Sequence, residues 1–71
     1  MTAEEFIAAF AERIGAPAPD EAQLDAVLRL ASVAAHASER KAAPVACWLA
    51  GAAGMSLAEA EAAARALAGE K

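Results

Sequence analysis

Alanine abundance is the feature that most limits how this chain can fold. Of its 71 residues, 25 are alanine, the residue with the highest helix propensity. Only three valines, two isoleucines and one threonine occur, and no segment alternates apolar and polar residues with the period of a strand. The sequence therefore predicts an all-α fold. Because a chain of this length makes one small domain, we expect residues 1–71 to form a single helical domain, a compact bundle of four short helices.

Capping residues and glycines delimit four helical segments. Three capping boxes, each an N-cap side chain followed three residues later by Glu or Gln, are formed by Thr2 with Glu5, Asp20 with Gln23, and Ser56 with Glu59. Pro44 suits the first turn of the third helix, where its missing N–H costs nothing. We expect Gly15, Gly54 and Gly69 to end the first, third and fourth helices, and the second helix to end near Ala37.

The larger apolar residues must supply nearly all of the core. On the first helix, Phe6, Phe10 and Ile14 recur every four residues and form one stripe. The second helix is apolar over more than half its circumference, so we expect the first helix to cover one side and the later helices the other. Its two apolar faces are Leu24, Val27, Leu28, Ala31 and Ala35, and Leu30, Val33 and Ala37. The expected buried faces of the third and fourth helices are Val45, Trp48, Leu49 and Ala52, and Leu57, Ala60, Ala64 and Leu67.

The charge balance limits the classes of partner. The formal net charge is −4, which argues against general binding to nucleic acid or to an anionic membrane, although residues 26–48 carry three bases and one acid. Glu4 and Glu5 stand where an export signal would be positive, and no segment has the roughly 20 strongly apolar residues of a membrane span. The single cysteine, Cys47, excludes an internal disulfide. We therefore predict a cytoplasmic location.

Basic side chains gather near the end of the second helix. Arg29, His36 and Arg40 have i, i+7, i+11 spacing, so a continued helix would present them on one side, where they could bind a phosphate, a carboxylate or a partner. The alternative is structural, because basic residues complement the dipole at a helix C-terminus. His36, Glu39 and Cys47 lack the spacing of a metal site, and the neighbours of Cys47 favour a buried, inert thiol. We expect neither a metal nor a cofactor.

No catalytic arrangement is indicated. The pair Gly51 and Gly54 lacks the preceding strand and following lysine of a phosphate-binding loop. Acids in the first helical turns are typical of solvated caps. We expect Trp48 in the core, with an anchor at an interface as the alternative. Because no serine–histidine–acid set occurs, an enzyme is not expected.

A short motif spans the end of the second helix and the start of the third. Its residues are Ala35, His36, Glu39, Arg40, Ala42, Ala43 and Pro44. The run from Leu24 to Gly51 that contains it resembles a small uncharacterised helical family of high-GC bacteria, found alone or fused to nucleotidyltransferases of the molybdenum-cofactor guanylyltransferase type. The resemblance implies an accessory role near molybdopterin guanine dinucleotide assembly or a molybdoenzyme, without catalytic activity. The chain departs from that family at Val33, where the family has an acidic residue. A salt bridge or ligand role that the resemblance would assign to this acid is therefore not expected in this chain.

These observations predict a non-catalytic interaction module that contacts another protein, such as a molybdenum-cofactor or molybdoenzyme component, and that can form a homodimer. The predicted partner-binding residues are Arg29, His36, Glu39, Arg40, Lys41 and Pro44. Two alternatives stay open. One is a helper that holds a nucleotide or pterin phosphate on the basic surface of the second helix, and the other is a self-associating structural unit. We expect no nucleic-acid and no membrane partner.

Overall fold

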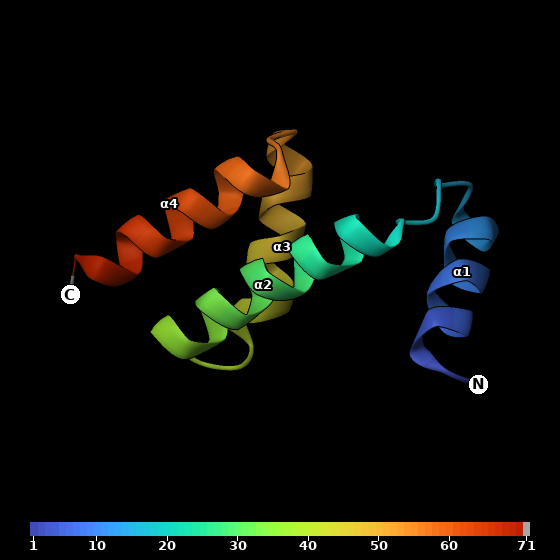
Figure 1. The fold of residues 1–71 in the computed structure, drawn as a ribbon, viewed down its shortest axis with the longest axis horizontal. Coiled ribbons are helices and arrows are strands. Elements are labelled where there is room, and N and C mark those ends of the chain that lie inside the picture. The colour runs from blue at the N-terminus through green and yellow to red at the C-terminus, as the bar shows by residue number, and fades with distance from the viewer. Residues whose placement is uncertain (71) are drawn as a thin grey trace.

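Four helices make up the fold in a computed structural model that describes residues 1–70. They are α1 (Ala3–Ile14), α2 (Glu21–Ala37), α3 (Ala42–Ala53) and α4 (Leu57–Gly69), and residues 1–70 contain no strand (Figure 1). The predicted all-α bundle of four short helices is confirmed. Pro44 lies in the first turn of α3, as expected. None of the described helices is long and apolar enough to cross a membrane.

Local capping signals set the helix boundaries. All three predicted capping boxes are formed, and in the first of them Glu5 N–H donates to Thr2 Oγ1 over 3.1 Å while Thr2 N–H donates to Glu5 Oε1 over 2.7 Å. Gly15 (φ 76°) and Gly54 (φ 70°) end α1 and α3 in the left-handed conformation, which glycine adopts without the steric cost of a Cβ. Gly69 is the last residue of α4 and lacks a positive φ, so α4 ends without a left-handed glycine.

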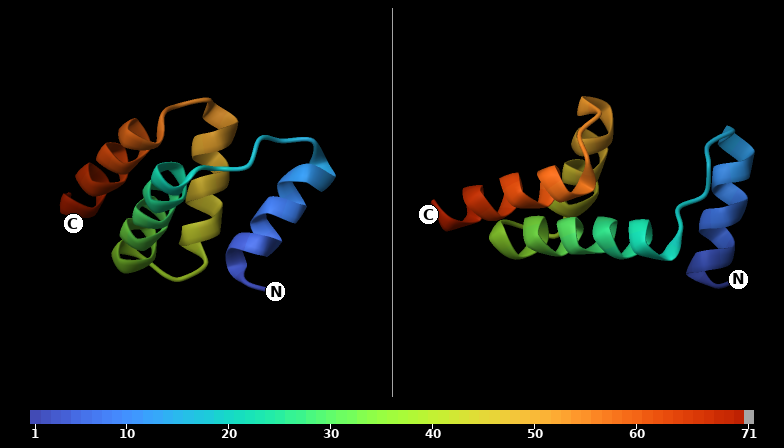
Figure 2. Two further views of the ribbon diagram at one scale, coloured as in Figure 1. Left: turned by 45° about the vertical axis from the view of Figure 1, so that its right-hand side comes forward. Right: turned by 45° about the horizontal axis from the view of Figure 1, so that its top comes forward.

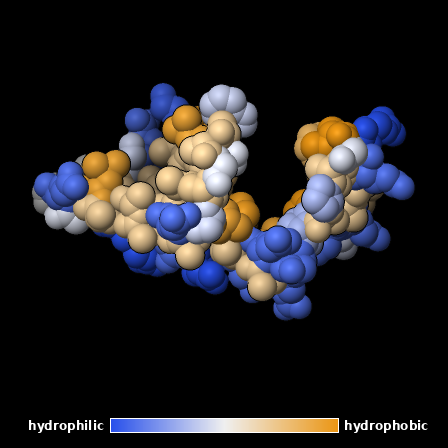
Figure 3. Space-filling model, turned by 90° about the horizontal axis from the view of Figure 1, so that it is seen from above, coloured by the Kyte–Doolittle hydropathy of each residue, from blue (hydrophilic) through white to orange (hydrophobic). Residues whose placement is uncertain are grey.

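The central helix is α2. Both α3 and α4 pack against it, with α3 crossing it and α4 lying beside it (Figures 1 and 2). The first helix, α1, packs closely against none of the others and stands across a hollow from them (Figure 3). The prediction that the first helix covers α2 is therefore wrong. Pro17 and Pro19 in the connection restrict the backbone to extended conformations, which direct α1 away from α2.

The core lies where α2, α3 and α4 meet. Its buried residues are Leu30, Ala50 and Ala60, with Cys47, Leu57 and Ala64 packed against them. Leu30 is only 2% exposed and is the one large side chain among the buried residues of the described chain. On the second predicted face of α2, Val33 and Ala37 are half-buried beside it, as expected. Leu67, predicted to lie on the buried side of α4, is exposed because it falls near the helix end, beyond the core.

The third helix, α3, packs on α2 through the face opposite to the predicted one. Cys47 and Ala50 point into the core, whereas Trp48 is 70% exposed and Leu49 is 55% exposed. The prediction that Trp48 and Leu49 are core residues is wrong, and so is the same prediction for Leu28, which is 57% exposed. Val45 and Ala52, expected on the same buried face, are exposed as well. The small side chains of the packed face let the two helix axes approach closely, which favours dense packing over burial of the largest residues.

Candidate functional site

Two of the predicted partner-binding residues, Arg29 and His36, share one face of α2. Arg40, predicted to lie on the same side of a continued helix, does not join them, because α2 ends at Ala37 and Ser38 has an irregular backbone (φ −142°, ψ −99°). The helix that would align Arg40 with Arg29 and His36 therefore does not continue that far. The basic residues are divided between a helix face and a turn.

The turn between α2 and α3 holds most of the remaining predicted residues. The four that lie in this turn or at the start of α3 are all exposed: Glu39, Arg40, Lys41 and Pro44. The N–H groups of Ala42 and Ala43 donate to the carbonyls of Glu39 and Arg40 over 3.0 and 3.1 Å. Because Pro44 has no N–H, the first three residues of α3 offer no free backbone donor to an anion.

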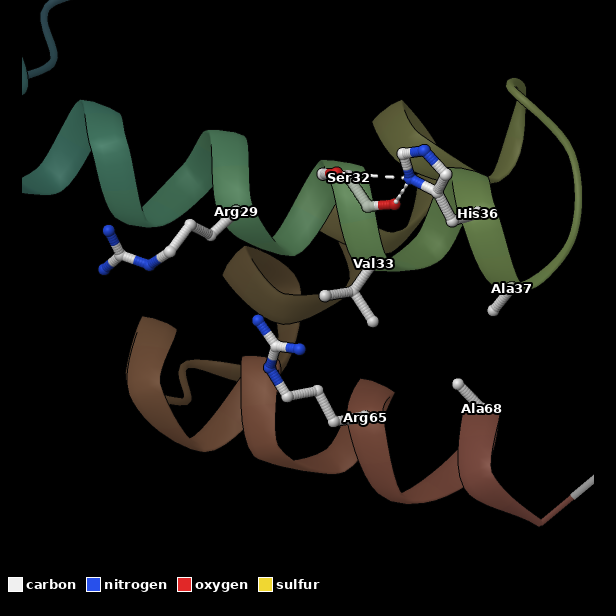
Figure 4. Close-up of a pocket in the computed structure, with 7 residues that line it drawn as sticks. All are labelled: Arg29, Ser32, Val33, His36, Ala37, Arg65 and Ala68. Atoms are coloured by element: carbon white, nitrogen blue, oxygen red, sulfur yellow. Dashed lines mark hydrogen bonds between the residues drawn. The ribbon is translucent and has the colours of Figure 1, made fainter.

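A groove of about 640 Å³ runs along the contact of α2 with α4, and Arg29 and His36 lie on its α2 side (Figure 4). This α2–α4 groove is lined by Arg29, Ser32, Val33, His36, Ala37, Arg65 and Ala68. Sequence reasoning missed Ser32 and Arg65. The i, i+4 spacing of Glu61 and Arg65 could have indicated a pair within one helix, but nothing local indicates that α4 lies beside α2.

One carboxylate joins two arginines beside this groove. Arg65 Nε–H donates to Glu61 Oε2 over 2.8 Å, and Arg29 Nε–H donates to Glu61 Oε1 over 3.3 Å. The hydrogen bond from Arg65, with a smaller contribution from Arg29, lowers the pKa of Glu61 below its ordinary range. Glu61 is therefore ionised at neutral pH and links α2 to α4.

The ring of His36 is oriented by the preceding turn of its own helix. His36 Nδ1 lies 2.7 Å from the Ser32 carbonyl oxygen and 3.2 Å from Ser32 Oγ (Figure 4). Since a carbonyl oxygen can only accept, Nδ1 carries the hydrogen and donates it. The second ring nitrogen, Nε2, is left for solvent or a ligand.

Cys47 is half-buried against α2. Its Sγ lies 3.8 Å from the carbonyl oxygen of Val27, and burial raises the pKa of the thiol above its ordinary value. A raised pKa lowers the thiolate fraction, which agrees with the prediction of an inert thiol. Residues 1–70 contain no group of three or more His, Cys, Asp or Glu side chains that could hold a metal ion.

Two helices present large apolar side chains to solvent. The α1 face consists of Met1, Phe6, Phe10 and Ile14, and the α3 face consists of Val45, Trp48 and Leu49. The rings of Phe6 and Phe10 stack with centroids 6.1 Å apart and planes 8° from parallel. A shallow groove of about 230 Å³ runs along the α1 face. Apolar residues lie on both sides of the hollow between α1 and the other helices (Figure 3).

The chain belongs to a family described as a domain of unknown function (DUF6457), whose model matches residues 1–71. This agrees with the resemblance to an uncharacterised domain family. Neither a curated protein nor a solved structure matches the chain.

Proposed function

We propose that this DUF6457 domain is a non-catalytic interaction module that binds another protein through its α1 and α3 faces. The observation that supports this proposal is the size of the exposed surface. The chain exposes 5360 Å², whereas a folded monomer of its mass exposes about 4,100 Å². The excess of about 1,300 Å² exceeds the roughly 800 Å² that one partner buries in a specific complex of ordinary size.

The composition of these faces favours a protein partner. Phe6, Phe10 and Trp48 are aromatic, and aromatic side chains are the most frequent energetic anchors of protein interfaces. The net charge of −4 opposes attachment of the same faces to an anionic membrane. The free thiol of Cys47 suits the reducing cytoplasm, which is the location that we propose.

The predicted residues of the α2–α3 turn supply a polar rim to the α3 face. Pro44 directly precedes Val45, so Arg40, Lys41 and Pro44 lie at one end of that face. Protein interfaces commonly have an apolar centre and a charged rim. In this proposal the aromatic residues provide affinity, and Arg40 and Lys41 orient the partner.

For the partner we propose a component of molybdenum-cofactor assembly, with a guanylyltransferase-type enzyme as the first candidate. This step rests on the motif from Ala35 to Pro44 and on the resemblance that it carries. Direct binding of the chain to that enzyme from the same organism, measured by biolayer interferometry, tests it. Absence of binding would remove the molybdenum link and leave the interaction role to be tested with proteins captured from the native host.

Three serine variants test the surface itself. Trp48→Ser and Phe10→Ser should each weaken partner binding about thirtyfold or more, since interface anchors contribute about 2 kcal/mol or more. Leu67→Ser is the matched control, because the exposure of Leu67 lies between those of Phe10 and Trp48 but Leu67 lies on α4. All three variants should keep the helical circular-dichroism spectrum. Arg40→Ala should weaken binding less than either anchor variant. Equal binding by the wild type and by both anchor variants would contradict the proposal.

A further inference from the structure

We infer that the α2–α4 groove binds a phosphate ester, with the phosphate on the terminal Nη groups of Arg29 and Arg65 and the organic part over Val33, Ala37 and Ala68. This site is separate from the α1 and α3 faces, and no residue of those faces lines it. The inference therefore goes beyond the proposed protein contact and can fail independently of it.

The positive charge of the groove exceeds what the fold neutralises. Arg29 and Arg65 share one carboxylate, Glu61, so one positive charge is left over. Within residues 1–70, the hydrogen bonds of both guanidinium groups use only Nε–H. Their terminal Nη groups are therefore open to an oxyanion, which guanidinium groups bind with two parallel hydrogen bonds.

The orientation of Arg65 argues against a role in capping α4. An arginine that neutralised the helix C-terminus would extend toward the last carbonyls of its own helix. Instead, the Nε–H of Arg65 is held by Glu61, one turn earlier, and its guanidinium points from α4 toward α2 (Figure 4). Glu61 thus holds both arginines at the groove and leaves their outer edges to a ligand.

The α2 rim adds two uncharged polar groups. Ser32 Oγ and His36 lie beside each other on α2, and the hydrogen bond from His36 Nδ1 to the Ser32 carbonyl leaves His36 Nε2 for a ligand. The Ser32 hydroxyl can donate to a phosphate oxygen, whereas an uncharged imidazole with its hydrogen on Nδ1 can only accept at Nε2. Two guanidinium groups with the Ser32 hydroxyl are a set of donors suited to a tetrahedral oxyanion, and His36, in the last turn of α2, can accept from a hydroxyl of the organic part.

The two ends of the groove differ, which determines the direction of the ligand. Ala37 and Ala68 lie together at the end where α2 and α4 terminate, and Arg29 lies toward the opposite end (Figure 4). Helix C-termini carry partial negative charge and repel an anion, so the phosphate belongs at the arginine end. The uncharged part then covers Val33 and the two alanines. A groove of about 640 Å³ exceeds the need of phosphate alone and falls within the usual range for small-molecule sites.

Titration of the ¹⁵N-labelled chain with phenyl phosphate, inorganic phosphate and phenol tests the inference by NMR. We expect saturable shifts of the Ser32, Val33 and Ala68 amides with phenyl phosphate, weaker binding of inorganic phosphate, and none of phenol. Arg65→Gln and Arg29→Gln should each weaken phenyl phosphate binding about tenfold, the effect of one charge-assisted hydrogen bond. Arg13→Gln, an identical change on α1, should leave it unchanged.

Two results would overturn the inference. One is the absence of saturable shifts at these amides, and the other is equal weakening by Arg13→Gln and the two groove variants, which would indicate nonspecific attraction. Thermal melts by circular dichroism check that each variant is folded. Trp48→Ser should bind phenyl phosphate as the wild type does, which separates this site from the protein-binding faces.

Discussion

Replacing Leu30 by alanine should remove much of the stability of this domain. Leu30 is 2% exposed at the contact of α2 with α3 and α4, and the other two buried residues there are alanines. Leucine-to-alanine changes in a core cost about 2–5 kcal/mol, and more where the surroundings cannot close the cavity. Alanines have no side-chain freedom with which to fill the gap, so we expect about 3–5 kcal/mol. A chain of 71 residues has a free energy of unfolding of about 4–11 kcal/mol in total, so this loss is a large part of it.

Urea unfolding followed by far-UV circular dichroism measures this loss. Leu28→Ala is the matched control, because it makes the same change two residues away on α2 at a side chain that is 57% exposed. Exposed positions usually change stability by about 0.5 kcal/mol or less. A loss below about 1 kcal/mol for Leu30→Ala, or equal losses for the two variants, would show that α2 does not pack on α3 and α4 through this face.

Four further outcomes are expected. In thermal melts, Gly54→Ala should destabilise the fold by about 1–2 kcal/mol, because Gly54 has φ 70°. Gly51 lies inside α3 with open space around a new Cβ, so Gly51→Ala should stabilise the fold by up to about 1 kcal/mol. The pKa of Glu61 is lowered in the folded chain, so its carboxylate stabilises the fold above the ordinary pKa of Glu, and this contribution is lost as the pH falls through the lowered pKa. The Tm of Glu61→Gln should therefore fall less than the Tm of the wild type between neutral pH and about pH 3. The fluorescence of Trp48 should resemble that of free tryptophan and be quenched by iodide, and a blue-shifted, protected spectrum at low concentration would place it in a core. Sedimentation should detect self-association at high concentration that Trp48→Ser reduces, and a strict monomer would remove the structural-unit alternative.

Local signals in the sequence determine where the helices begin and end. Thr2 with Glu5 and Asp20 with Gln23 form their capping boxes, and Gly54 has the expected left-handed conformation. These interactions join residues at most a few positions apart, so they do not depend on how the helices pack. The starts of α1, α2 and α4 and the ends of α1 and α3 were predictable for the same reason.

The face that each helix buries depends on the tertiary structure. The spacing of the large residues of α3, including Trp48, predicted that they form its buried face, yet α3 packs on α2 through Ala50 and Cys47. Arg65 became part of a groove with Arg29 only because α4 lies beside α2. In a chain so rich in alanine, several faces of a helix are smooth enough for close contact, and side-chain size alone does not select among them. That selection depends on the contacts of α2, α3 and α4 taken together, which act between residues far apart in the chain.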